Sequence, residues 1–213
     1  MPRTPVKAAA VAALAIGALA GCGSSPVKAG SAAIVGNDRI TTASLDRDVR
    51  DWRAQFLDNQ PANAAMAQSG ASSDSVRKAL NVRVLLRLAD RTADRAGIDV
   101  TGGQLAMIRA QFAQRPGGVD AVTLSNGLPT RYTGDIVRYF AITNALATRL
   151  LPGGTTGNPQ QAQAALRAAQ KQIADTAAST RVEINPRYGT FDRATASIGP
   201  VTSQLSGTEQ GIG

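Results

Sequence analysis

Few residues of this chain could do chemistry, and the composition excludes most designs for a catalytic site. The sequence has no His, and its one Cys is Cys22. Most zinc sites, Ser–His triads and histidine-based acid–base steps need side chains that are therefore missing. We expect no enzyme, no cofactor and no metal site.

One pair of carboxylates has a spacing that could suit catalysis. Asp90 and Asp94 lie four residues apart, which would place both on one face of a helix. They alternate with Arg87, Arg91 and Arg95. Such alternation of charge is typical of a solvated helix face with salt bridges. We interpret this segment as a structural surface.

Cys22 follows a segment that is typical of export signals. Arg3 and Lys7 precede an apolar run at 8–20, which is short for a membrane span. The run leads into Leu-Ala-Gly-Cys at 19–22, and this motif resembles the lipobox of bacterial lipoproteins. The resemblance implies a signal peptide at 1–21 that is cleaved, and acylation of Cys22 with chains such as palmitate.

Acylation would place the protein on a membrane. Two or more acyl chains hold a protein stably, at about 0.8 kcal/mol per buried methylene. We therefore expect a lipid anchor at the extracytoplasmic face of the bacterial cell membrane, followed by a lipidated tether at 22–30. The alternative is an ordinary secreted protein with an incidental cysteine, although an unpaired thiol is unusual in an oxidising compartment.

The basic charge of the chain is spread along it. The net charge of +8 would fall to +6 after cleavage, with 21 basic against 15 acidic residues. The sequence has no Lys/Arg block and no DNA-binding motif, so we expect no nucleic-acid partner. The excess of basic residues could serve to attract anionic lipid headgroups or to keep the protein soluble, and both interpretations stay open.

Sequence periodicity predicts a mainly α domain at 31–192. The pattern predicts a strand at 32–35 that pairs with a strand at 182–184, giving a small two-stranded sheet from the two ends of the chain. A mobile loop that can include a short helical piece is expected at 58–73, and a flexible tail at 193–213. Helices are expected from Thr41 or Thr42 through Phe56, from Ser73 or Asp74 to Gly97, from the capping box Thr101–Gln104 toward Pro116, near 119–124, over 132–151 and over 159–179.

Three segments carry a resemblance to a known family. They are AAIVGNDRI at 32–40, AGIDVT at 96–101 and VEINPRYGTFD at 182–192. In this order the chain resembles the SurA N-terminal domain family of chaperones, in a short lipoprotein form without a parvulin domain. The resemblance implies an orthogonal helical domain like the peptide-binding parts of SurA, PrsA and trigger factor, which holds unfolded polypeptide during export.

Isomerase activity is not expected, because only a short linker separates Leu151 from Pro159, whereas a parvulin domain needs about 90–100 residues. The expected function is non-catalytic, chaperone-like binding of unfolded or extended exported polypeptides. A scaffolding lipoprotein that binds one folded envelope partner is the alternative. The oligomeric state stays open.

Aromatic residues on helix faces are the candidates for contact with such a polypeptide, because they offer a large apolar area. The same helical spacing is also expected of residues that fill a core, and both interpretations stay open. The candidates are Trp52, Phe56, Phe112, Tyr132, Tyr139 and Phe140.

Overall fold

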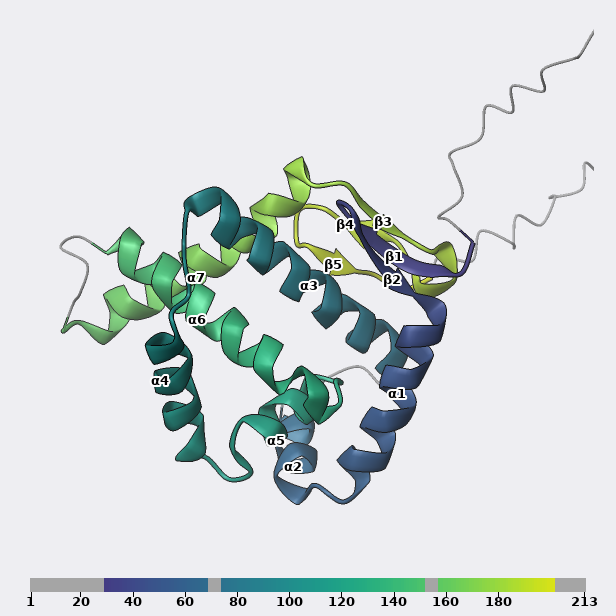
Figure 1. Cartoon of the computed structure of the whole chain (residues 1–213), viewed down its shortest axis with the longest axis horizontal. Coiled ribbons are helices and arrows are strands. Elements are labelled where there is room, and N and C mark those ends of the chain that lie inside the picture. The colour runs from purple at the N-terminus through teal and green to yellow at the C-terminus, as the bar shows by residue number, and fades with distance from the viewer. Residues whose placement is uncertain (1–28, 69–73, 152–156, 202–213) are drawn as a thin grey trace, which may run out of the picture.

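The computed structural model describes residues 29–68, 74–151 and 157–201, and this part of the chain is mainly helical with small antiparallel sheets (Figure 1). The signal peptide predicted at 1–21 and Cys22 lie outside the described residues. No helix in the described ranges is long and apolar enough to cross a membrane. The helices are α1 (Thr42–Leu57), α2 (Gln60–Gln68), α3 (Ser75–Ala96), α4 (Gly102–Ala113), α5 (Gly118–Ser125), η1 (Thr130–Tyr132), α6 (Thr133–Leu150), α7 (Pro159–Asp175), η2 (Thr176–Ser179) and η3 (Pro186–Tyr188). The strands are β1 (Ser31–Val35), β2 (Asp38–Thr41), β3 (Val182–Ile184), β4 (Phe191–Asp192) and β5 (Ser197–Ile198).

Several helix ends lie at the capping residues that the sequence predicts. The Thr41 side chain accepts a hydrogen bond from the backbone N–H of Ser44 at 3.1 Å and starts α1. Thr101 and Gln104 form the capping box at the start of α4. Gly97 ends α3 in the left-handed conformation. These predictions are confirmed.

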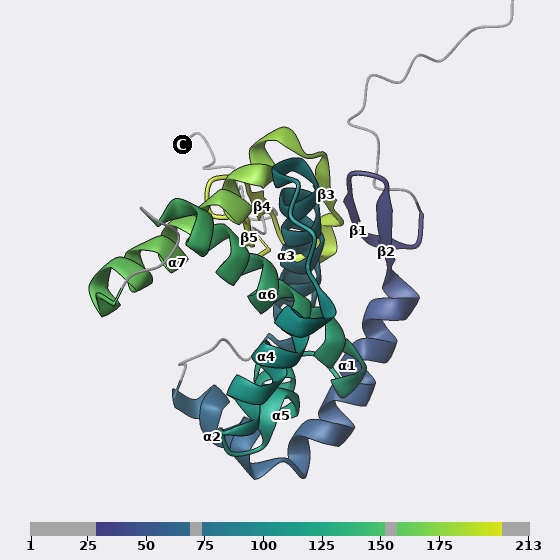
Figure 2. The same cartoon turned by 60° about the vertical axis from the view of Figure 1, so that its left-hand side comes forward.

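Helix α3 is the centre of the core. It contacts α1, α6, α7 and β1, with α1 and the β1–β2 hairpin on one side of it and α6 and α7 on the other (Figure 2). Its residues Leu80, Val84 and Leu88 are fully buried, as the stripe predicts, and Ile142 of α6 and Ile173 of α7 belong to the same cluster. Full burial of each such side chain contributes about 1.5–3 kcal/mol.

The pairing of the two ends of the chain is confirmed, and the sheet has one strand more than predicted. β1 pairs antiparallel with β3, with Ile34 opposite Glu183 and Val35 opposite Val182. After the turn that follows Val35, β2 returns along the other edge of β1, so the order is β2-β1-β3. Ile40 is the buried residue of β2, with Asp38 and Arg39 before it exposed and Thr41 after it partly exposed.

The loop predicted at 58–73 contains a helix. In α2, Ala62 is fully buried against Trp52, and the side chain of Asn59 accepts a hydrogen bond from the Ala62 N–H at 2.9 Å. The short helical piece that the sequence left open is therefore present as α2, and the mobile loop is wrong over Gln60–Gln68 because small alanines let α2 approach α5 closely. Residues 69–73 lie outside the described part.

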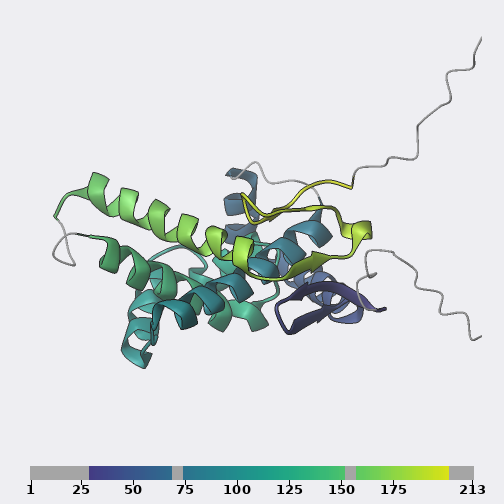
Figure 3. The same cartoon turned by 90° about the horizontal axis from the view of Figure 1, so that it is seen from above.

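The ordered chain also continues past residue 192, where a flexible tail was expected. β4 and β5 form a hairpin, and Ile198 is buried in the main core. The Ile198 N–H donates to the Asn81 side chain of α3 at 2.9 Å, which ties the hairpin to the central helix. The strands gather at one end of the molecule, while α6 and α7 extend side by side toward the other (Figure 3).

Substitution of Gly189 by Ala tests the packing of this hairpin. Gly189 has φ +126°, and a Cβ placed there would lie 2.0 Å from the Gly199 carbonyl oxygen. We expect G189A to lower the free energy of unfolding by more than about 1 kcal/mol in urea denaturation. G134A is the matched control, since Gly134 in α6 has nothing within 4 Å of its Cβ position. Equal stability of the two variants would contradict the described packing.

Candidate functional site

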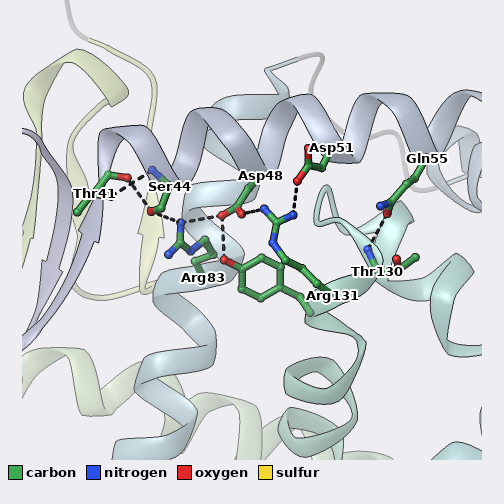
Figure 4. A network of polar contacts seen from close by, with 9 residues as sticks. Thr41, Ser44, Asp48, Asp51, Gln55, Arg83, Thr130 and Arg131 are labelled. Atoms are coloured by element: carbon green, nitrogen blue, oxygen red, sulfur yellow. Dashed lines mark hydrogen bonds and ion pairs between the residues drawn. The ribbon is translucent and has the colours of Figure 1, made fainter.

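A buried carboxylate joins three parts of the fold. Asp48 of α1 has a relative exposure of only 2%. Its Oδ2 accepts hydrogen bonds from Arg83 Nη1 of α3 at 2.7 Å and from the Tyr132 hydroxyl of η1 at 2.9 Å (Figure 4). Its Oδ1 accepts from Arg131. We call Asp48, Arg83, Arg131 and Tyr132 the Asp48 clamp.

Neighbouring contacts extend the Asp48 clamp along α1. Arg83 also donates to Ser44 Oγ at 3.0 Å, and Arg131 forms a second ion pair with Asp51. Further along the helix, Gln55 Oε1 accepts from the Thr130 N–H at 2.8 Å (Figure 4). Both arginines are thus occupied by carboxylates of the chain, so the arrangement serves to hold α1 against α3 and η1.

Tyr132, one of the aromatic residues predicted to contact a polypeptide, has a polar role in this structure. Burial raises the pKa of Tyr132, Asp48 raises it further, and Arg83 and Arg131 lower it. The hydroxyl therefore stays protonated and donates a hydrogen bond to Asp48. Its ring is partly buried, with the guanidinium carbons of both arginines 5.6 Å from the ring centroid.

The acidic pair on α3 has the contacts of a salt-bridged surface. Asp90 Oδ1 accepts from Arg138 Nε at 2.8 Å, and Arg87 lies 3.9 Å from the other carboxylate oxygen. Asp94 is exposed. Within residues 29–68, 74–151 and 157–201, no group of three or more His, Cys, Asp or Glu could hold a metal ion.

An open apolar hollow lies where α1 ends beside the start of α3. Trp52 and Phe56 stack with their ring centroids 4.9 Å apart. Trp52 is fixed from behind, because its Nε1 donates to the Leu124 carbonyl at 2.7 Å. Leu57 is 76% exposed at the rim. The hollow, which we call the Trp52 hollow, has a volume of about 320 Å³ and is lined by Trp52, Arg53, Phe56, Leu57 and Ser75.

A second hollow lies between α4 and α6. It has a volume of about 220 Å³, and Met107 at its edge is 61% exposed. Besides apolar side chains, the lining includes the side-chain amides of Gln104 and Asn144, which can form hydrogen bonds with a polypeptide backbone. The lining residues are Gln104, Met107, Ile108, Ala141, Asn144, Ala145 and Thr148.

The remaining candidate aromatic residues pack within the fold. Phe112 of α4 is buried against Phe140 of α6, with ring centroids 4.9 Å apart. Tyr139 meets Phe140 edge to face at 5.5 Å. Tyr139 and Phe140 also line a recess of about 60 Å³ with residues of α3. The six aromatic candidates therefore form separate groups, and only Trp52 and Phe56 lie at the larger open hollow.

Two residues of the described sites, Leu57 and Asp48, were not among the candidates from the sequence. Leu57 lies just outside the stripe of α1 that ends in Phe56, so its position could have indicated an exposed apolar side chain. Asp48 lies three residues after Leu45 and four before Trp52, so a charge stands on the buried face of α1. A charge in that position signals a buried partner.

Removal of the central carboxylate tests the Asp48 clamp. D48A leaves the largely buried Arg83 without its carboxylate, and we expect a loss of about 3–5 kcal/mol in the free energy of unfolding. D51A removes only the half-exposed ion pair with Arg131 and is expected to cost less than about 1 kcal/mol. Urea denaturation of both variants measures the difference. D48N, which keeps one acceptor oxygen, should fall between them, and a D48A as stable as D51A would contradict the role of the clamp.

Comparison with protein-family models, with curated proteins and with solved structures finds no match to this chain. The geometry of the described residues therefore carries the functional argument.

Proposed function

We propose that the protein is a non-catalytic, lipid-anchored binding protein that holds apolar segments of unfolded or extended exported polypeptides. The observation that carries the proposal is the Trp52 hollow, where the exposed Leu57 and the partly buried Phe56 present apolar surface to solvent beside Trp52, which is itself only 8% exposed. Burial of one large apolar side chain there would contribute about 1.5–3 kcal/mol.

The distribution of apolar surface supports an extended ligand. Two open hollows lie on different helix pairs, one at α1 and α3 and the other between α4 and α6. Each can take a side chain, and the hollow between α4 and α6, at about 220 Å³, is smaller than the roughly 300–1,000 Å³ typical of small-molecule pockets. Several weak contacts of this kind suit short apolar stretches of one chain.

The location belongs to the same proposal. The lipobox at 19–22 supports anchoring through Cys22 at the extracytoplasmic face of the membrane. We also propose that the helical domain has the orthogonal arrangement of SurA-like domains. The support for this is the order along the chain of the three segments that resemble that family. A tether at 22–30 would lead directly into β1.

Titration of the single tryptophan tests the proposed binding. The buried core runs from Ser31 to Ile198, so the chain from Gly23 to Gly213 carries it complete without the lipid. We expect saturable changes in Trp52 emission with several unrelated unfolded polypeptides, together with suppression of their aggregation. L57S should weaken binding about tenfold, because it removes apolar surface at the rim.

The matched control is L150S, which alters an exposed leucine at the end of α6 away from the Trp52 hollow. It should bind as the unaltered chain does. Absence of binding to every unfolded polypeptide would contradict the proposal, and binding to a single folded envelope protein instead would favour the scaffolding alternative.

Substitution of Cys22 tests the anchor. In cells that express the full chain, we expect C22S to abolish incorporation of labelled palmitate and to move the protein out of the membrane fraction. Unchanged labelling of C22S would contradict acylation at this residue. S24C in the C22S background serves as the control, since it restores a thiol without restoring the lipobox spacing.

A further inference from the structure

The rim of the Trp52 hollow carries a positive charge. Arg53 follows Trp52 on α1, is exposed and lines the hollow. Its Nη2 donates to Ser75 Oγ at 3.3 Å, a contact with a neutral partner. Across the described ranges 29–68, 74–151 and 157–201, no carboxylate lies within ion-pair distance of Arg53.

Unlike Arg53, the two arginines of the neighbouring Asp48 clamp form ion pairs with carboxylates. Arg83 and Arg131 each pair with a carboxylate of the chain, and their charges are compensated inside the fold. Among the described residues, no carboxylate forms an ion pair with Arg53, and its charge lies beside apolar surface. The low polarity of the adjacent rings strengthens its attraction for an anion compared with open water.

These two features select a ligand chemistry. A side chain that enters the hollow lies against Trp52, Phe56 and Leu57, which favours a leucine or an aromatic residue. Residues next to that side chain in the ligand then lie at the rim, beside Arg53. A carboxylate there forms an ion pair, and an ammonium is repelled.

We propose that the Trp52 hollow binds polypeptide segments in which a large apolar residue is flanked by Asp or Glu. This inference rests on the proposed function and adds the ligand preference of its larger hollow. Arg53 supplies selectivity, and the apolar residues supply most of the binding energy.

Three peptides with blocked ends test the preference. Each carries a central Leu, flanked by Glu in the first peptide, by Gln in the second and by Lys in the third. Blocked ends leave the flanking side chains as the sole source of carboxylate. In titrations followed by Trp52 fluorescence, the Glu peptide should bind about fivefold more tightly than the Gln peptide, and the Lys peptide most weakly. Added salt should reduce this difference.

Charge reversal at the rim gives the decisive comparison. R53E should invert the order, so that the Lys peptide binds most tightly. R50E is the matched control, because Arg50 is an exposed arginine on the same helix that does not line the hollow. It should keep the original order. A circular dichroism spectrum like that of the unaltered chain confirms that each variant is folded.

The outcomes separate this inference from the proposed function. Equal binding of the three peptides, or an order that R53E leaves unchanged, would overturn the acidic preference while peptide binding stands. A lack of response to all three peptides and to unfolded polypeptides would overturn both. Concentration-dependent dimerisation that L57S abolishes would show that a second copy occupies the hollow, and would overturn the inference.

Discussion

A single buried charge sets the arrangement of the helices. Asp48 lies on the apolar face of α1, and burial of an unpaired carboxylate would cost several kcal/mol. The fold must therefore bring Arg83 from α3 and Arg131 and Tyr132 from η1 to the same point. Because hydrogen bonds depend on direction as well as distance, these contacts fix the angle of α1 more narrowly than apolar packing does. The Trp52 hollow, one turn further along α1, depends on that angle.

The parts of the fold that sequence could predict are those fixed by local interactions. The Thr41 cap, the capping box at Thr101 and the end of α3 at Gly97 each depend on a few neighbouring residues, and all were confirmed. The pairing of β1 with β3 was also predictable, since two short strand segments at opposite ends of a helical chain had few other partners. Helix α2 was expected only as a short helical piece within a mobile loop, because its burial depends on the close packing of small alanine side chains, which composition alone does not show.

The candidate site was predictable only in part, and for a related reason. Helical spacing shows that Trp52 and Phe112 each lie on the apolar stripe of their own helix. It cannot show which of these stripes another helix covers. Phe112 is covered by α6, whereas Trp52, although about equally buried, lies with Phe56 in the wall of an open hollow. Arg53 and Leu57 line a hollow only because the start of α3, which is distant in sequence, lies beside them. Contacts between such distant segments follow from the fold and leave no mark on local periodicity.

The order of strands in the sheet has a consequence for how the chain matures. β1 lies between β2 and β3, so the second edge of this central strand is covered only by residues from the far end of the domain. Synthesis delivers β1 and β2 first, and about 140 further residues must follow before β3 can close the sheet. During that interval the backbone groups of β1 along that edge are unpaired and can accept a foreign strand. A nascent copy of this protein is therefore itself an extended chain in need of protection until β3 has been synthesised.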